Sequence, residues 1–406
     1  MANIQVFPLR VQVGDHVEEL NQRVRSFLTD LENNSDNNYH LVNSISDFDD
    51  GDLGVFFVES GKVEPLFRDI TEIVRGPYYL LTMDYGDSLS AALEIVSYLH
   101  GVGKEGIIIH GTGSEINEQI NKHIEEKIYT LSKEGFRLGI IGRPSDWLIG
   151  SEVDYFRARM VFNVDLTDLT MQELIFDYAG ISAHLEQGRL EAVYDEKELN
   201  KAYRVYKALK VMIRDHHLDG IALCGEDLFN SLRATPSLAV SLLGERGIVA
   251  LEETDVTSLL CALNLKYALH APSFEGHPFF IDARNNNIAF DSNSVPLNMT
   301  ESYSFGPDYH FEEGIAVKGI LKKEPVTVVM LSNGLRHFYA EEGEIVANLA
   351  GKAHRKTQIL VHLSSASVEN LLVHPLGGRA LIVYGHHQAE IEKYYLSRGL
   401  KRSGTD

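Results

Sequence analysis

The chain has 406 residues and a formal net charge of −21, with 44% hydrophobic and 23% charged residues. This is an ordinary globular composition, long enough for two or three domains. The acidic excess argues against nucleic acid and anionic membranes as partners, since both would repel the chain. Two cysteines, no signal-peptide pattern and no apolar run of the roughly 18 residues that span a bilayer predict a cytoplasmic protein without disulfides.

Residues 1–136 are predicted to form an N-terminal α/β domain. Apolar strands at residues 54–58, 78–83 and 106–110 alternate with amphipathic helices. This alternation is typical of βαβ units, and it predicts a Rossmann- or flavodoxin-like parallel sheet. Gly111-Thr112-Gly113 follows the third strand and matches part of a dinucleotide-binding fingerprint. Because the third glycine is absent, a plain tight turn is favoured over a nucleotide site.

Residues 137–270 are predicted to form a second α/β domain of the same type. Its first strand, residues 137–142, leads into a loop that holds the only tryptophan of the chain, Trp147. An aromatic side chain in a loop rich in proline and serine either stacks on a sugar ring or fills a domain interface. Residues 220–224 form a further predicted strand, and acidic residues follow it.

The most informative stretch of this domain runs from residue 235 to residue 256. Thr235 before Pro236 indicates the start of a helix, and residues 247–251 read as a buried parallel strand. Glu252, Glu253 and Asp255 come directly after that strand. Ligands of open α/β sheets bind at the carboxyl ends of the strands, so these acids are candidates for metal binding or proton transfer. The alternative is a solvated acidic loop.

Residues 271–406 show short strand-like segments in place of alternating strands and helices, and they are predicted to form a β-rich C-terminal domain. A hairpin around residues 285–287 places Asp282 opposite its apolar neighbours, and short glycine-bounded strands follow it, up to residues 381–385. These features are typical of an antiparallel barrel or sandwich, and we predict a mostly antiparallel β-barrel. A helix is predicted at residues 387–400.

Five segments together resemble the L-fucose isomerase and L-arabinose isomerase superfamily, and especially its shorter fucose isomerase-like members. The matching segments are residues 142–154, residues 235–241, residues 250–256, the hairpin around Asp282 and residues 381–385. They occur in the order of the superfamily and cover about residues 135–400. The N-terminal third matches only in its α/β character.

The resemblance implies a metal-assisted aldose–ketose isomerase. Proteins of this superfamily use a divalent cation, usually Mn²⁺, which polarises the carbonyl while a base moves a proton between C1 and C2. By the resemblance, Glu253 and Asp282 are the metal ligands and catalytic acids, supplied by different domains. Trp147, Ser145 and Arg379 are the expected substrate-binding residues. The expected ligand is a monosaccharide, and the expected assembly is a homo-oligomer, a trimer or a hexamer.

Two departures from the superfamily pattern leave an alternative open. Asp291-Ser292-Asn293 stands where a His-Cys-Gly turn is usual, and Arg379 stands where a metal-binding histidine is usual. An arginine stays charged and does not ligate a metal, but it can pair with Glu253 and Asp282. The candidates to replace the histidine are His374, His386 and His387. The chain is therefore either an isomerase or a protein of this fold that binds a sugar or another small ligand without isomerising it.

Overall fold

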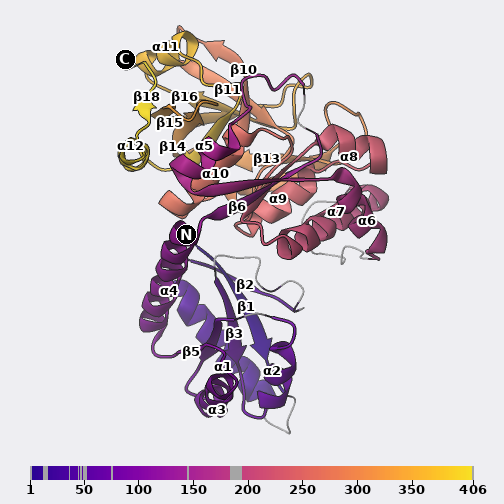
Figure 1. The fold of residues 1–406 in the computed structure, drawn as a ribbon, viewed down its shortest axis with the longest axis vertical. Coiled ribbons are helices and arrows are strands. Elements are labelled where there is room, and N and C mark those ends of the chain that lie inside the picture. Colours follow the sequence, from indigo (N-terminus) through magenta and orange to yellow (C-terminus); the bar gives the residue numbers. More distant parts are fainter. Residues whose placement is uncertain are drawn as a thin grey trace. The chain divides into compact units, whose positions relative to one another are not determined.

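The computed structural model describes residues 2–11, 17–35, 37–43, 45, 48, 53–74, 76–143, 146–182 and 194–404, without the side chains of residues 127–134. The chain divides into two compact units, Met1–Thr130 and Leu131–Asp406. Figure 1 shows the elements of each unit, and we describe each unit by itself. The predicted fold class is confirmed: two parallel α/β sheets precede a closed antiparallel barrel.

The first unit contains a five-stranded parallel sheet with the order β2-β1-β3-β4-β5. Along its central strand, Phe56 and Val58 pack into one hydrophobic cluster, whereas Val55 and Phe57 pack into the other. Successive side chains of a strand point to opposite faces, so each face of the sheet has its own core. The strands are β1 (Asn3–Leu9), β2 (Asn38–Leu41), β3 (Leu53–Val58), β4 (Tyr78–Thr82) and β5 (Gly106–Ile109).

Helices α2 (Glu64–Ile70) and α3 (Ser88–Gly101) cover one face of this sheet, and α1 (Val17–Asn33) and α4 (Gly113–Glu134) cover the other. The Gly111-Thr112-Gly113 segment forms the start of α4. There the backbone amide of Thr112 donates to Glu115 Oε2 over 2.8 Å. A carboxylate of the chain thus occupies the helix N-terminus, which is the position that a phosphate would need.

The second unit begins with a four-stranded parallel sheet of order β7-β6-β8-β9. Leu138 and Ile140 of its strand β6 face one cluster, and Ile141 faces another. The strands are β6 (Phe136–Ile141), β7 (Val164–Leu169), β8 (Gly220–Leu223) and β9 (Val249–Leu251), and the helices are α5 (Tyr155–Phe162), α6 (Met171–Gly180), α7 (Glu196–Asp215), α8 (Gly225–Leu232), α9 (Ser237–Glu245) and α10 (Val256–Leu269).

A six-stranded antiparallel barrel follows in the same unit, with the order β14-β17-β10-β11-β16-β15, and it closes through the pairing of β14 with β15. Closure removes the exposed strand edges that an open sheet would carry. The barrel strands are β10 (Phe274–Asp282), β11 (Asn287–Ser292), β14 (Pro325–Leu331), β15 (His337–Asn348), β16 (Thr357–His362) and β17 (Ala380–Tyr384). The remaining elements are η2 (Leu297–Met299), β12 (Thr300–Gly306), β13 (Ala316–Leu321), α11 (Ser365–Val373), α12 (Gln388–Ser397) and β18 (Lys401–Arg402).

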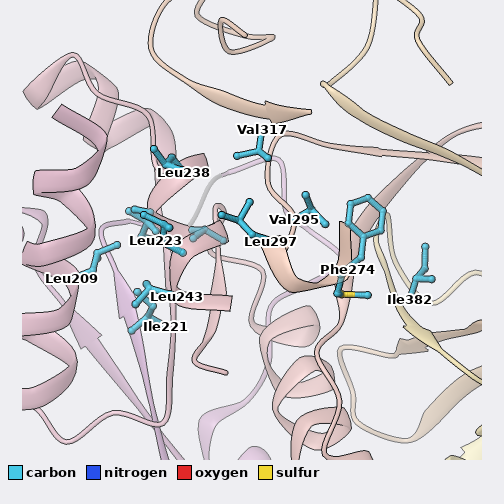
Figure 2. Close-up of a cluster of buried hydrophobic side chains, with 14 of the residues drawn as sticks. Leu209, Ile221, Leu223, Leu238, Leu243, Phe274, Val295, Leu297, Val317 and Ile382 are labelled. Carbon is cyan, nitrogen blue, oxygen red and sulfur yellow. The ribbon is translucent and has the colours of Figure 1, made fainter. Parts of the chain in front are cut away.

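One hydrophobic cluster joins the second sheet to the barrel. Leu209, Leu223 and Leu238 come from α7, β8 and α9, and they belong to the same buried cluster as Phe274 and Ile382 of the barrel (Figure 2). A second cluster joins strand β6 and helix α10 to the outer side of β14 and β17. The sheet and the barrel therefore share their hydrophobic core.

Helix α10 lies between the sheet and the barrel and is buried along most of its 14 residues. A helix that is covered on several sides can be apolar all round, which accounts for its composition. Among the described residues, no helix has both the length and the apolar character that a bilayer crossing requires.

Candidate functional site

Three segments of the second unit bring charged side chains together. Glu253 and Asp255 follow strand β9, and Asp255 caps α10 by accepting a hydrogen bond from the Ser258 amide. Antiparallel pairing sets Gly276 of β10 opposite Ala380 of β17. Since side chains alternate along a strand, Glu275 points away from the barrel interior that Phe274 fills. Arg379 immediately precedes β17 and contacts Glu275 from there.

Arg379 is the centre of this group, which we call the Arg379 cluster; its other members are Glu253, Asp255, Glu275 and His277. Arg379 is 5% exposed, and its guanidinium donates to Asp255 Oδ2 over 2.9 Å, to Glu253 Oε2 and to His277 Nε2 over 3.3 Å. Burial lowers the pKa of Arg379, but the surrounding carboxylates raise it by more. The side chain therefore remains a cation, held by acids that are themselves largely buried.

A cavity of about 350 Å³, which we call the central cavity, adjoins this cluster. Its walls include Trp147 and Phe311 together with a second guanidinium, that of Arg355. Arg355 Nη1 donates to Asp291 Oδ1 over 3.2 Å, and its Nη2 lies 3.8 Å from Glu253 Oε1. The described lining carboxylates are Glu226, Glu252, Glu253, Glu275 and Asp308.

Two of these carboxylates have an oxygen that accepts no hydrogen bond within the described part of the chain, Glu252 Oε1 and Glu275 Oε1. Glu252 Oε2 accepts from Ser237 Oγ over 2.9 Å, and Glu275 Oε1 lies 3.5 Å from Arg379 Nε without a hydrogen bond. Burial raises the pKa of Glu252 to about 7 and that of Glu275 to about 8. Both groups can therefore hold or release a proton near neutral pH.

His277 is held neutral beside this cavity. Burial and the nearby Arg355 and Arg379 lower its pKa well below the ordinary value. A guanidinium can only donate, so the ring nitrogen that meets Arg379 must be the acceptor. The proton of the His277 ring is consequently on Nδ1.

The structure brings some of the predicted site residues together and not others. Glu253 and Arg379 lie in the Arg379 cluster, and the predicted pairing of Arg379 with Glu253 is present. Trp147 lines the central cavity with 58% of its surface exposed, and its ring centre lies 5.2 Å from Arg379 Cζ. Ser145 lies outside the described residues.

Asp282 is not brought to Glu253. It ends strand β10, five residues beyond His277, which corresponds to roughly 16 Å of extended chain. Its carboxylate accepts hydrogen bonds from the Arg284 and Asn285 amides and from Asn285 Nδ2. The Asn285 side chain is the main cause of its lowered pKa. Asp282 thus stabilises the hairpin turn, and Asp255 and Glu275 stand beside Arg379 where Asp282 was expected.

The residues present do not fit the divalent cation that the superfamily resemblance implies. Asp255 and Glu253 already bind the Arg379 guanidinium, and the ring nitrogen of His277 that faces the cluster accepts from it. No group of three or more His, Cys, Asp or Glu side chains in the described ranges is arranged to hold a metal.

The histidines considered as replacements for the missing ligand do not line the central cavity. His386 and His387 contact Glu342 and Glu390, and the exposed His374 ends helix α11.

Sequence reasoning missed Glu275, His277 and Arg355 as site residues. The alternation along β10, with Phe274 on one face and Glu275 on the other, was a usable signal for the first two. Arg355 gave no local signal, because it reaches the cavity from the segment between β15 and β16 only when the barrel closes. No protein-family model matches the chain, and a search of curated proteins finds no match.

Proposed function

We propose that the central cavity binds a monosaccharide, and that Arg379 takes the place of the divalent cation used by isomerases of the resembled superfamily. The observation that carries this proposal is the Arg379 guanidinium, buried among Glu253, Asp255 and Glu275 directly behind the cavity wall. It supplies a permanent positive charge there and already binds Glu253 and Asp255, the acids that follow strand β9.

The cavity lining suits a small polyhydroxylated molecule. Its volume lies within the range of about 300–1,000 Å³ that is usual for small-ligand sites. Carboxylates and Asn293 offer hydrogen-bond acceptors to hydroxyl groups, while Trp147 and Phe311 offer aromatic faces to the apolar side of a sugar ring. Phe311 is itself held by Phe229, with ring centres 4.0 Å apart.

Calorimetric titration with L-fucose, L-arabinose and further monosaccharides, in the presence of EDTA, tests this function. We expect saturable binding of at least one sugar that added MnCl₂ does not strengthen. Trp147→Ala should weaken it about ten-fold through the loss of the stacking surface. Phe176→Ala, at an exposed aromatic residue of α6 outside the cavity, is the matched control. Absence of binding for every sugar, or tight binding of Mn²⁺ to the natural chain, contradicts the proposal.

Aldose–ketose isomerisation without a metal is a second candidate function, and it is favoured by one pairing of residues. Glu252, with its unpartnered oxygen, and the Arg355 guanidinium line the same cavity. Moving a proton between neighbouring carbons requires a base, together with a group that stabilises the developing oxygen charge.

The isomerisation candidate is tested by incubating aldoses with the chain in EDTA and following ketose formation by ¹³C NMR. Turnover that Glu252→Gln removes and Glu324→Gln, at an exposed turn, leaves intact is the result expected for this candidate. Sugar binding without turnover rejects isomerisation and leaves the binding function standing.

A further inference from the structure

Acidic side chains outnumber guanidiniums around the central cavity. The described lining residues include five carboxylates but only one guanidinium, that of Arg355. Asp291 already pairs with Arg355, and Glu253 and Asp255 already pair with Arg379 behind the wall. Glu275 shares the Arg379 guanidinium with them at a longer distance, 3.5 Å between Arg379 Nε and Glu275 Oε1, so two guanidiniums serve more acids than they can neutralise.

The other charged and titratable lining groups are already satisfied or neutral. Asp308 accepts hydrogen bonds from Asn293 Nδ2 and from the amides of His310 and Phe311. His310 Nε2 accepts from Arg355 Nη2, so this ring nitrogen carries no proton. Glu226 is exposed at the start of α8, where water solvates it.

Glu275 is a buried carboxylic acid with an incomplete set of hydrogen bonds, which is uncommon in native proteins. It is 7% exposed and lines the cavity, yet its Oε1 accepts no hydrogen bond from the described residues. A buried carboxylate oxygen without a donor is costly unless a partner arrives from outside the chain. Glu252 Oε1, on the same cavity, also has no hydrogen-bond partner among the described residues, and the neighbouring Ser294 hydroxyl lowers the pKa of this carboxyl against the larger effect of burial. Two buried acceptors facing one space call for a ligand that brings donors and positive charge.

We infer that the ligand of the central cavity carries a protonated amine, so that amino sugars are the class of monosaccharide that it takes. This inference rests on the proposed function and narrows it. An ammonium group offers three donors and no acceptor, which matches two unpartnered carboxylate oxygens better than a hydroxyl does. The Trp147 and Phe311 rings add faces that attract a cation. Burial is the main cause of the raised pKa of Glu275, Arg379 lowers it, and Asp255, Glu253 and Glu252 raise it further; an ammonium group would neutralise the field of these three acids.

The experiment compares three probes of nearly equal shape: D-glucosamine, D-glucose and N-acetyl-D-glucosamine, followed by a second trio built on D-galactosamine. Each is titrated calorimetrically into the full chain in EDTA. We expect the amino sugar of at least one trio to bind about ten-fold or more tightly than its two neutral counterparts, as a charge-assisted hydrogen bond in a buried site predicts. Equal affinities within both trios overturn the inference and leave the proposed function standing, whereas no binding of any sugar removes both.

Two variants assign the amine preference to the cavity. Glu275→Gln and Glu252→Gln each keep the side-chain shape and remove one acidic group, so each should reduce the preference for the amino sugar about ten-fold while neutral sugars bind as before. Glu324→Gln, which removes an acid from an exposed turn, should change nothing and controls for the overall acidity of the chain. If both cavity variants still prefer the amino sugar, its amine does not bind at Glu252 and Glu275, and the inference is overturned. Near-ultraviolet circular dichroism confirms that each variant is folded.

Discussion

Replacing Arg379 with alanine is expected to destabilise the second unit by about 3–5 kcal/mol at neutral pH, the cost typical of removing one partner from a buried ion pair. The change leaves Asp255, Glu253 and Glu275 facing each other in a buried position without their common cation. Because Trp147 is the only tryptophan of the chain, its fluorescence during urea unfolding reports on this unit.

Two comparisons separate this effect from a general effect of losing an arginine. Arg159→Ala breaks the pair with Asp165, in which both side chains are largely exposed, and it should cost less than about 1 kcal/mol. The Arg379→Ala deficit should also shrink at pH 5, because the stranded carboxylates can then be protonated. A variant as stable as the natural chain at pH 7 would show that Arg379 does not hold these acids together.

Glu275→Gln is expected to stabilise the chain increasingly as the pH rises. The pKa of Glu275 is raised from an ordinary value of 4.5 to about 8 in the folded chain, mainly by burial. Between these two values the unfolded chain has released this proton and the folded chain retains it. The natural chain therefore loses stability with rising pH, by about 1.4 kcal/mol per pH unit, until the pH passes the folded-state pKa. Glutamine does not titrate, so the variant is free of this loss.

Urea unfolding at pH 5, 6.5 and 8, followed by Trp147 fluorescence, measures the difference between the two chains. We expect the curves to nearly coincide at pH 5, where a protonated Glu275 and a glutamine are close in shape and charge, and to separate toward pH 8. Glu324→Gln serves as the control at an exposed position. A constant difference across this range would mean that Glu275 ionises in the folded chain as it does in water.

The fold class was predictable because it depends on local patterns. Alternating strands and helices gave the two parallel sheets, and short strands separated by glycines gave the barrel. The strand predicted at residues 247–251 is present as β9, and the acids after it do line the site. It is shorter than predicted, and only Leu251 is buried, because β9 is the edge strand of its sheet.

The candidate site was only partly predictable, because it depends on contacts between distant residues. The guanidinium of Arg379 was expected to bind both Glu253 and Asp282. It instead donates hydrogen bonds to Glu253 and Asp255. Placing Asp282 correctly required the register of β10 against β17, which no local pattern specifies. The role of Arg355 could not be predicted for the same reason, because its side chain meets Asp291 only when β16 pairs with β11.

The hydrophobic cluster shared by the parallel sheet and the barrel has a consequence for how the second unit moves. Domains that open and close on a ligand usually meet through small, polar contacts, whereas a large apolar contact resists bending. With leucines of α7 and α9 packed in one cluster with Phe274 and Ile382, hinge opening would expose that cluster to water. We therefore expect the parallel sheet and the barrel to keep their relative position when a ligand binds, with little change in the spacing of the acids around Arg379.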